Sequence, residues 1–368
     1  MYSQLAQRRH EIEQELQDTF EPTVVELKTK TKTIPFNPAS RQQIADRLIK
    51  RGWKPKAFTN TGEPKVDETV LAGIDMPEAR LLNEYLLLNK RIGQIATGKQ
   101  AWLKMEKDGK LHGRVNHMGA VTSRCTHSNP NMAQVPAVYS PYGKECRELW
   151  TVSNPETHQL VGTDASGLEL RCLAHYMNDA KFTNEVLTGD VHTANMKAAG
   201  LSNRDQAKTF IYAFLYGAGP AKIGSVVGGN SSDGQKLIGK FLKNMPALNK
   251  LRKDIGAVAS KGLIRGLDGR MLHIRHEHAA LNTLLQGAGA VVCKRWLVEM
   301  DRMIWEHGLD AKLVASVHDE YQFEVAKPDI ESFTKITKEA MYTTQEILNF
   351  KCDLDSDFKV GNNWAETH

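Results

Sequence analysis

Residues 312–326 read KLVASVHDEYQFEVA, and this stretch decides the fold class of the chain. The pattern predicts two strands that meet in a tight turn at His318, Asp319 and Glu320. A second apolar run, QLVGTD at 159–164, predicts a strand that ends on Asp164. Strands alternate with long helical patterns between 150 and 310, which indicates an α/β or α+β core and not a helical bundle.

The chain has 368 residues and a formal net charge of +5, a size that suits two or three packed subdomains. Five scattered cysteines without a CxxC pair indicate neither a disulfide framework nor a zinc site. The N-terminus has no apolar signal region, and no run of about 18 apolar residues is present. We therefore expect a cytoplasmic protein that does not enter a membrane.

The first hundred residues are predicted to be mainly helical and basic. Helices are expected over 3–20, from a cap at Asn37 or Ser40 to Gly52, and over 66–74 and 77–96, with a Thr/Lys-rich connector at 27–35. Beyond them, 107–120 is rich in turn residues, and β-type sequence follows, including LWTVSN at 149–154. Residues 28–56 form a dense basic cluster in which Asp46 is the single acidic residue. The basic residues are Lys28, Lys30, Lys32, Arg41, Arg47, Lys50, Arg51, Lys54 and Lys56. Such a cluster is typical of polyanion binding, and an ordinary solvated surface is the alternative.

The run RDQAKTFIYAFLYG at 204–217 places two cations and two aromatic rings on one side of a predicted helix. Arg204, Lys208, Tyr212 and Tyr216 recur at every fourth position. Cations of this kind bind phosphates by charge-assisted hydrogen bonds, and a tyrosine ring further along can pack near a sugar and base. Spacing alone also fits a surface helix with core tyrosines.

Asp164 and Asp319 each lie at a predicted strand end. Isolated acids in such places are usually solvated or capping residues. A buried pair of carboxylates would instead suit two Mg²⁺ ions, which prefer oxygen ligands and keep waters that substrate phosphates can replace. Local sequence does not show whether the two acids meet.

Together, TDASGLELRCLAHYM at 163–177, RDQAKTFIYAFLYGAG at 204–219 and LVASVHDEYQFEV at 313–325 resemble motifs A, B and C of the family A DNA polymerases, most closely the T7-type phage branch. GAVTSRCTHSNPNMAQVP, GLDGR, LNTLLQGAGA and NNWAETH extend the resemblance. It implies an α+β right-hand polymerase fold, with an antiparallel palm sheet and helical fingers and thumb. The implied domains are a thumb at 1–105, incomplete at its N-terminus, palm at 106–177 and 301–368, and fingers at 178–300.

The resemblance also implies which residues bind metal and nucleotide. Asp164 and Asp319 would hold two Mg²⁺ ions about 4 Å apart, with Mn²⁺ as a substitute and with the Ala165 carbonyl and an accessory Glu320 as further ligands. Lys208 would bind the α-phosphate and act as general acid toward pyrophosphate. The other implied contacts to the deoxynucleoside triphosphate (dNTP) are Glu169, His192, Arg204, Tyr212 and Tyr216.

Two of these residues bear on sugar choice. Glu169 resembles a glutamate that blocks a ribose 2′-hydroxyl, which favours deoxyribonucleotides over the substrates of the single-subunit RNA polymerases that share this fold. Tyr212 implies weak discrimination against dideoxynucleotides. Read without the family, His192 is more often a plain surface or core histidine.

The resemblance further implies contacts with a DNA primer-template. Arg124 and Gln286 would reach the minor groove, where acceptors are nearly the same for every correct base pair and geometry can be checked without reading sequence. His318 would lie beside the primer end. Gln134 and Asn282 are lesser candidates, because structural hydrogen bonds of their amides explain them equally well.

The chain departs from the family in two ways. No domain-sized sequence precedes the first expected thumb helix, so we expect no 3′→5′ exonuclease. The thumb has no long insertion, so we expect low processivity, salt-sensitive DNA binding and a possible need for a separate upstream exonuclease or thumb polypeptide or a processivity factor. The implied role is phage DNA replication in the host cytoplasm. The alternatives are a catalytically impaired remnant that binds primer-template, and an RNA polymerase of the same fold.

Overall fold

The computed structural model describes residues 1–27, 30–189 and 191–368, which divide into two compact units. The smaller unit comprises 1–114 and 129–131, and the larger comprises 115–128 and 132–368. The division at Arg114 lies beyond the predicted thumb boundary at 105. Each unit has its own buried residues.

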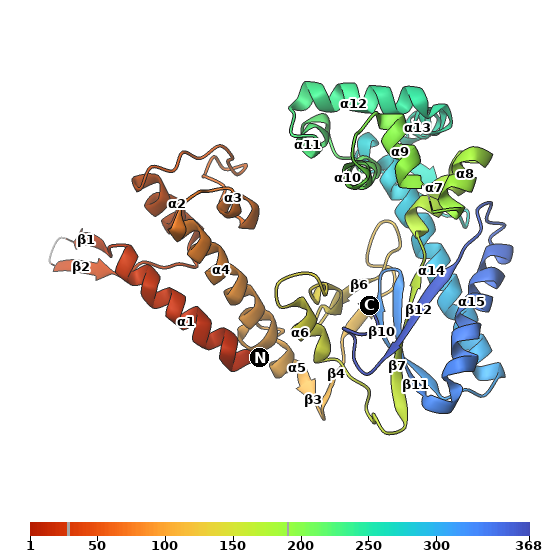
Figure 1. Cartoon of the computed structure of the whole chain (residues 1–368), viewed down its shortest axis with the longest axis horizontal. Coiled ribbons are helices and arrows are strands. Elements are labelled where there is room, and N and C mark those ends of the chain that lie inside the picture. Colours follow the sequence, from red (N-terminus) through yellow and green to blue (C-terminus); the bar gives the residue numbers. More distant parts are fainter. Residues whose placement is uncertain (28–29, 190) are drawn as a thin grey trace. The chain divides into compact units, whose positions relative to one another are not determined.

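The smaller unit is built on two long helices, α1 Tyr2–Thr19 and α4 Pro77–Ile92 (Figure 1). Arg8 Nε lies 2.8 Å from Glu84 Oε1 and joins the two helices. Helix α2 Arg41–Lys50 begins at Ser40, whose hydroxyl accepts the Gln43 N–H, and Gly52 follows it with φ +102. The predicted cap and stop are therefore confirmed. The other elements of this unit are α3 Glu68–Ala72, the π-helix η1 Gly93–Thr97, α5 Trp102–Met105, β3 Glu106–Lys107 and β4 Lys110–Leu111.

The expected connector at 27–35 is wrong for its described residues, because Leu27 and residues 30–34 belong to two paired strands. Strand β1 Thr23–Leu27 pairs antiparallel with β2 Lys30–Ile34, and three of the five residues in each strand are β-branched. Arg47 donates to the Glu21 carbonyl and to Thr23 Oγ1 at 2.8 Å each, which ties α2 to this strand pair. Lys28 of the basic cluster lies outside the described residues.

The larger unit is organised around an antiparallel sheet, as predicted, and this sheet has four strands. Its strand order is β10 Ala311–Val317, β11 Glu320–Ala326, β7 His158–Ala165 and β12 Ser356–Gly361. The two strands predicted on either side of His318–Glu320 are β10 and β11, and the strand predicted at 159–164 is β7. The β-type reading of 149–154 is wrong as a strand, since only Thr151 pairs there, in an isolated bridge with Asn363.

Helices α14 Ala280–Glu306 and α15 Ile330–Ile347 lie on one side of this sheet (Figure 1). The Trp296 ring of α14 lies 5.4 Å from the Tyr321 ring of β11, and Phe333 of α15 lies 4.8 Å from Phe323. The Trp296 indole N–H donates to the Thr337 carbonyl at 2.8 Å. These aromatic contacts fix the sheet against its two covering helices.

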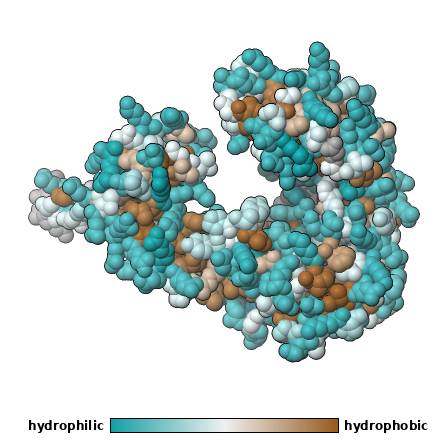
Figure 2. Space-filling view, viewed as in Figure 1, coloured by the Kyte–Doolittle hydropathy of each residue, from teal (hydrophilic) through white to brown (hydrophobic). Residues whose placement is uncertain are grey.

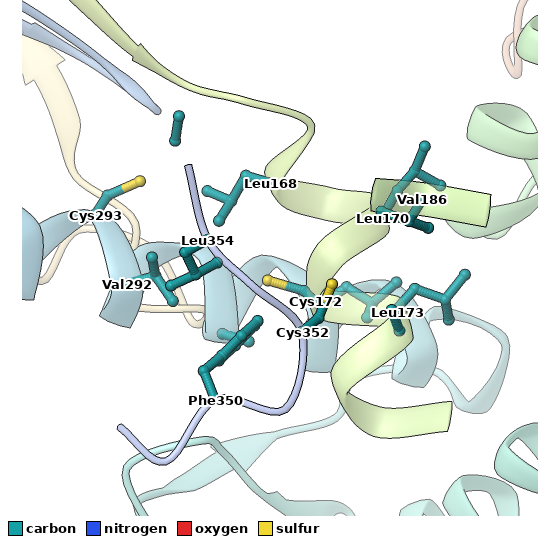
Figure 3. Packing of buried hydrophobic residues seen from close by; sticks show 14 of the residues in the cluster. Leu168, Leu170, Cys172, Leu173, Val186, Val292, Cys293, Phe350, Cys352 and Leu354 are labelled. Carbon is teal, nitrogen blue, oxygen red and sulfur yellow. The ribbon is translucent and has the colours of Figure 1, made fainter. Parts of the chain in front are cut away.

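A hydrophobic cluster extends this core toward α7 Leu168–Met177. Figure 3 shows Cys172 and Leu173 of α7 packed beside Cys352 and Phe350 of the segment that precedes β12. All five cysteines are free thiols, and four are buried. Helix α7 is thus anchored directly after the strand that carries Asp164.

The helices between α7 and α14 in the sequence lie around the N-terminal end of α14, which carries Gln286 (Figure 1). They are α8 Ala180–Leu187, α9 Val191–Ala199, α10 Arg204–Leu215, α11 Pro220–Val226, α12 Ser231–Asn244 and α13 Pro246–Ala259. The shorter elements are β5 Arg114–Asn116, β6 Thr126–Ser128, η2 Met132–Gln134, α6 Gly143–Glu148, β8 Leu263–Arg265, β9 Met271–His273, η3 Glu277–Ala279 and η4 Lys327–Asp329. The predicted fingers boundary at 300 falls inside α14.

The surface in Figure 2 is mainly hydrophilic, with hydrophobic residues in scattered patches. Among the described residues, no helix is both long and apolar enough to span a bilayer.

Candidate active site

The sheet brings Asp164 and Asp319 together although 154 residues separate them in the sequence. Asp164 of β7 faces Glu320 of β11 in the antiparallel register, and Asp319 directly precedes Glu320. The Ala165 N–H donates to the Asp319 carbonyl at 3.1 Å, so both acids lie at the same end of the central strand pair. Gly167, with φ +57, then turns the chain into α7.

Negative charge is crowded at this end of the sheet. The protein atoms packed around Asp164, together with the nearby carboxylates of Asp319 and Glu320, raise its pKa to about 7, although the residue is exposed to solvent. Within residues 1–27, 30–189 and 191–368, no Lys or Arg forms an ion pair with Asp164 or Asp319. Two carboxylates without a protein counter-ion are oxygen donors that suit a hard divalent cation.

Glu320 lies in the same place but is already engaged by protein donors. Its Oε1 accepts hydrogen bonds from Trp364 Nε1 and Gln322 Nε2, each at 2.6 Å, and its Oε2 lies 2.7 Å from His368 Nδ1. Burial alone would raise the pKa of Glu320, but these three partners hold it below its ordinary value. A metal ion at Glu320 would have to compete with these partners.

Helix α10 presents the predicted basic and aromatic face. Asn203 caps it by accepting the N–H groups of Asp205 and Gln206. A neighbouring face of the helix is buried and carries Ala207, Phe210, Ile211, Phe214 and Leu215. Arg204 and Lys208 are left exposed on the outer face.

His192 of α9 lies beside that face, as its predicted role requires. Its ring centroid is 6.2 Å from that of Tyr212. Burial and the charges of Arg204 and Lys208 lower the pKa of His192, which keeps the imidazole neutral near pH 7. The histidine, the two cations and Tyr212 thus form one cluster.

Glu169 and Tyr216 form a direct link between α7 and the end of α10. The Tyr216 hydroxyl donates to Glu169 Oε1 at 2.6 Å. The rings of Tyr212 and Tyr216 lie 6.4 Å apart and nearly parallel. Burial and the charges of Glu169 and Asp319 raise the pKa of Tyr212, so Tyr212 lies within electrostatic reach of both acids.

One pocket gathers most of the remaining predicted residues. Arg124, Glu169, Gln286, His318 and Asp319 all line it. His318 is in the left-handed backbone region, with φ +60, in the tight turn between β10 and β11. Strain of this kind in a non-glycine residue is common at functional sites.

Two predicted residues do not line this pocket. Gln134 ends the short helix η2, which packs near β10. Asn282 lies on the same face of α14 as Gln286, one turn earlier. Their roles stay predictions.

The pocket also contains residues that the sequence reasoning missed, notably Lys294 and Cys125. Lys294 lies eight residues, or two helical turns, after Gln286 on the same face of α14. This spacing from Gln286, which itself lies four residues after Asn282, could have identified Lys294 from the sequence. Asp357 of β12 was also missed. It lies opposite Asp164 in the register, and no pattern around it indicates that neighbour.

Comparisons with known proteins agree with this arrangement. The model of DNA polymerase family A matches residues 3–366. The DNA-directed DNA polymerases of Enterobacteria phage T3 and Escherichia phage T7 are 45% and 44% identical to the chain, over 92% of its length and 54% of theirs. DNA polymerase I of Pseudomonas aeruginosa is 25% identical over 90% of the chain and 39% of its own length.

A solved structure shows the same fold at lower sequence identity. The polymerase domain of Pol1 from M. smegmatis, in complex with DNA primer-template and dNTP, matches with a TM-score of 0.84 at 20% identity. The match covers 100% of this chain and 66% of that one. The α+β polymerase fold expected from the sequence is therefore confirmed. The chain spans about half the length of the phage relatives, and it belongs to DNA polymerase family A.

Proposed function

We propose that this chain catalyses template-directed addition of deoxynucleotides to a primer 3′ end, in phage DNA replication within the host cytoplasm. The observation that carries the proposal is the meeting of Asp164 and Asp319 at one end of the sheet, with Tyr212 of α10 within electrostatic reach of Asp319. Similarity to phage DNA polymerases supports the same conclusion.

The carboxylates of Asp164 and Asp319 and the Ala165 carbonyl fit two Mg²⁺ ions, or Mn²⁺ in their place. When bound, the ions would lower the pKa of the primer 3′-hydroxyl and neutralise negative charge on the phosphates. Glu320 would contribute to this site as an accessory group, chiefly by adding negative charge, since three protein partners already engage its carboxylate.

The α10 face would bind and orient the triphosphate. Arg204 and Lys208 are exposed cations one turn apart and can hold neighbouring phosphates, with His192 beside them. Lys208 carries protons that it can donate to the departing pyrophosphate. Catalysis then rests mainly on alignment and electrostatics, as in phosphoryl transfer generally.

Sugar selection would depend on Glu169, whose carboxylate is held by Tyr216. A carboxylate fixed where the 2′ position of the sugar lies leaves no room for a ribose hydroxyl. Tyr212 on the preceding turn would accept dideoxynucleotides almost as well as deoxynucleotides. This arrangement favours DNA synthesis over the RNA polymerase alternative.

Arg124, Gln286 and His318 would contact the primer-template from the shared pocket, with Gln134 and Asn282 as lesser contacts. We assign 1–105 to the thumb, 106–177 and 301–368 to the palm, and 178–300 to the fingers. We also propose that the chain alone extends primers without 3′→5′ excision and with low processivity. A separate partner polypeptide or processivity factor would then increase processivity.

One assay separates the proposed function from its rivals. A labelled primer-template is incubated with Mg²⁺ and either deoxy- or ribonucleotides, with the wild-type chain and Asp319→Ala. We expect extension by deoxynucleotides that Asp319→Ala abolishes, and no shortening of a mismatched primer. DNA binding without extension would support the remnant, and extension by ribonucleotides would support the RNA polymerase.

A further inference from the structure

Arg124 lies at the end of a tight turn, residues 117–124, which we call the Arg124 turn. Inside the turn, the Ser123 N–H donates to the Ala120 carbonyl at 2.8 Å, and the Ala120 N–H donates to the Arg124 carbonyl at 3.3 Å. Ser123 is 4% exposed and has φ +61, a conformation that surrounding contacts must maintain.

Lys294 of α14 supplies the first of these contacts. Its Nζ donates to the Ser123 carbonyl at 2.6 Å and also to the His117 carbonyl, so one ammonium group holds both ends of the turn. Lys294 forms no ion pair with any acidic group among the described residues. Hydrogen bonds from a charged donor are stronger than those from a neutral donor. The positive charge of Lys294 therefore strengthens its hydrogen bonds to the two carbonyl groups of the turn.

Arg270 supplies a second contact from the loop that joins β8 and β9. Its Nη1 donates to Ser123 Oγ at 2.6 Å, while its Nε donates to Asp268 Oδ2 at 2.6 Å. Asp268 therefore fixes the guanidinium that grips the turn. The close approach of α14 completes the arrangement, since a Cβ on Gly287 would lie 2.7 Å from Leu272 Cδ1 and 3.8 Å from the Thr122 carbonyl oxygen.

We propose that Lys294, assisted by Arg270, is a positioning residue that sets Arg124 for its contact with the primer-template. Lys294 and Arg124 line the same pocket as Gln286 and Asp319, so a displaced turn would move Arg124 relative to the reacting groups. A shift of about 1 Å in a positioning group can cost as much as 100-fold in rate. The inference rests on the proposed polymerase function and adds residues that the function did not use.

A double-mutant cycle tests the inference. Lys294→Met, Arg124→Ala and the double variant are compared with the wild type for kcat/KM of single-nucleotide addition and for Kd of a primer-template with a recessed 3′ end. Lys335→Met, whose side chain is 72% exposed on α15, is the matched control and should equal the wild type. We expect Lys294→Met to lose about tenfold in kcat/KM, about 1.4 kcal/mol, and the double variant to match Arg124→Ala within twofold.

Losses that multiply in the double variant, or a fully active Lys294→Met, would overturn the inference. Melting curves check that each variant folds. Should Lys294→Met unfold, Ser123→Ala offers a milder test, because it removes only the hydroxyl that accepts the hydrogen bond from Arg270. In the wild-type background Ser123→Ala should lower kcat/KM about threefold, about 0.6 kcal/mol. In the Arg124→Ala background it should cause no further loss. The inference would also be overturned if Ser123→Ala leaves kcat/KM unchanged, or if it lowers kcat/KM equally in the Arg124→Ala background. A wild type that adds no nucleotide contradicts the proposed function instead, and the Kd cycle still decides the inference.

Discussion

The hydrogen bond from Tyr216 to Glu169 predicts how strictly the sugar is selected. Tyr216→Phe removes the hydroxyl and leaves the Glu169 carboxylate free to swing toward water, which opens space for a ribose 2′-hydroxyl. A hydrogen bond to an ionised acceptor contributes about 1.5–3 kcal/mol. Because Tyr216 is 48% exposed, water competes for the carboxylate, and we take the lower end of this range. Discrimination against ribonucleotides should therefore fall about tenfold.

The assay measures kcat/KM for the same nucleotide as deoxy and ribo forms on one primer-template. Glu169→Ala should lower the ratio further than Tyr216→Phe, because it removes the blocking group itself. Tyr342→Phe changes a 54% exposed tyrosine on α15 and should leave the ratio unchanged. If Glu169→Ala lowers the ratio and Tyr216→Phe does not, Tyr216 has no positioning role. If neither lowers it, Glu169 does not select the sugar.

Three further predictions concern stability and nucleotide choice. Because the pKa of Asp164 is raised from 3.8 to about 7, ionisation of Asp164 destabilises the metal-free fold as the pH rises through this interval. Asp164→Asn should therefore raise the Tm in EDTA at pH 8 but not at pH 4. Equal shifts of the Tm at both pH values would contradict the raised pKa. Tyr212→Phe should exclude dideoxynucleotides at least tenfold more strongly than the wild type, measured by chain termination, and an unchanged ratio would refute its assigned role. Gly162→Ala should lower the free energy of unfolding by about 1–3 kcal/mol in urea titrations, because the added Cβ would lie 2.2 Å from the Thr367 carbonyl oxygen. A variant as stable as the wild type would contradict this tight packing of the C-terminal segment against Gly162.

The sequence predicted local elements where a pattern is strong and self-contained. Strands β10 and β11 and helix α10 follow from periodicity over a dozen residues or more, and the cap at Ser40 follows from its side chain. The β1–β2 strand pair was missed because its lysines and threonines resemble a solvated connector, and its pairing depends on cross-strand contacts.

The site depended on information that local sequence does not contain. The meeting of Asp164 with Asp319 results from the pairing of β7 with β11, across a long separation in the sequence, and only the family resemblance anticipated it. Asp357 was not anticipated at all, because its place beside Asp164 is set only by the register of β12. Lys294 is different, because its spacing from Gln286 on one helix face was visible in the sequence.

The central claim is that Asp164 and Asp319 together carry nucleotide addition. The most direct measurement is single-turnover addition of one deoxynucleotide to a bound primer-template in Mg²⁺, by the wild type, Asp164→Asn and Asp319→Asn. We predict that each substitution lowers the rate by at least about 1,000-fold, about 4 kcal/mol, while Kd for the primer-template changes little. Addition by either variant at close to the wild-type rate would contradict the claim.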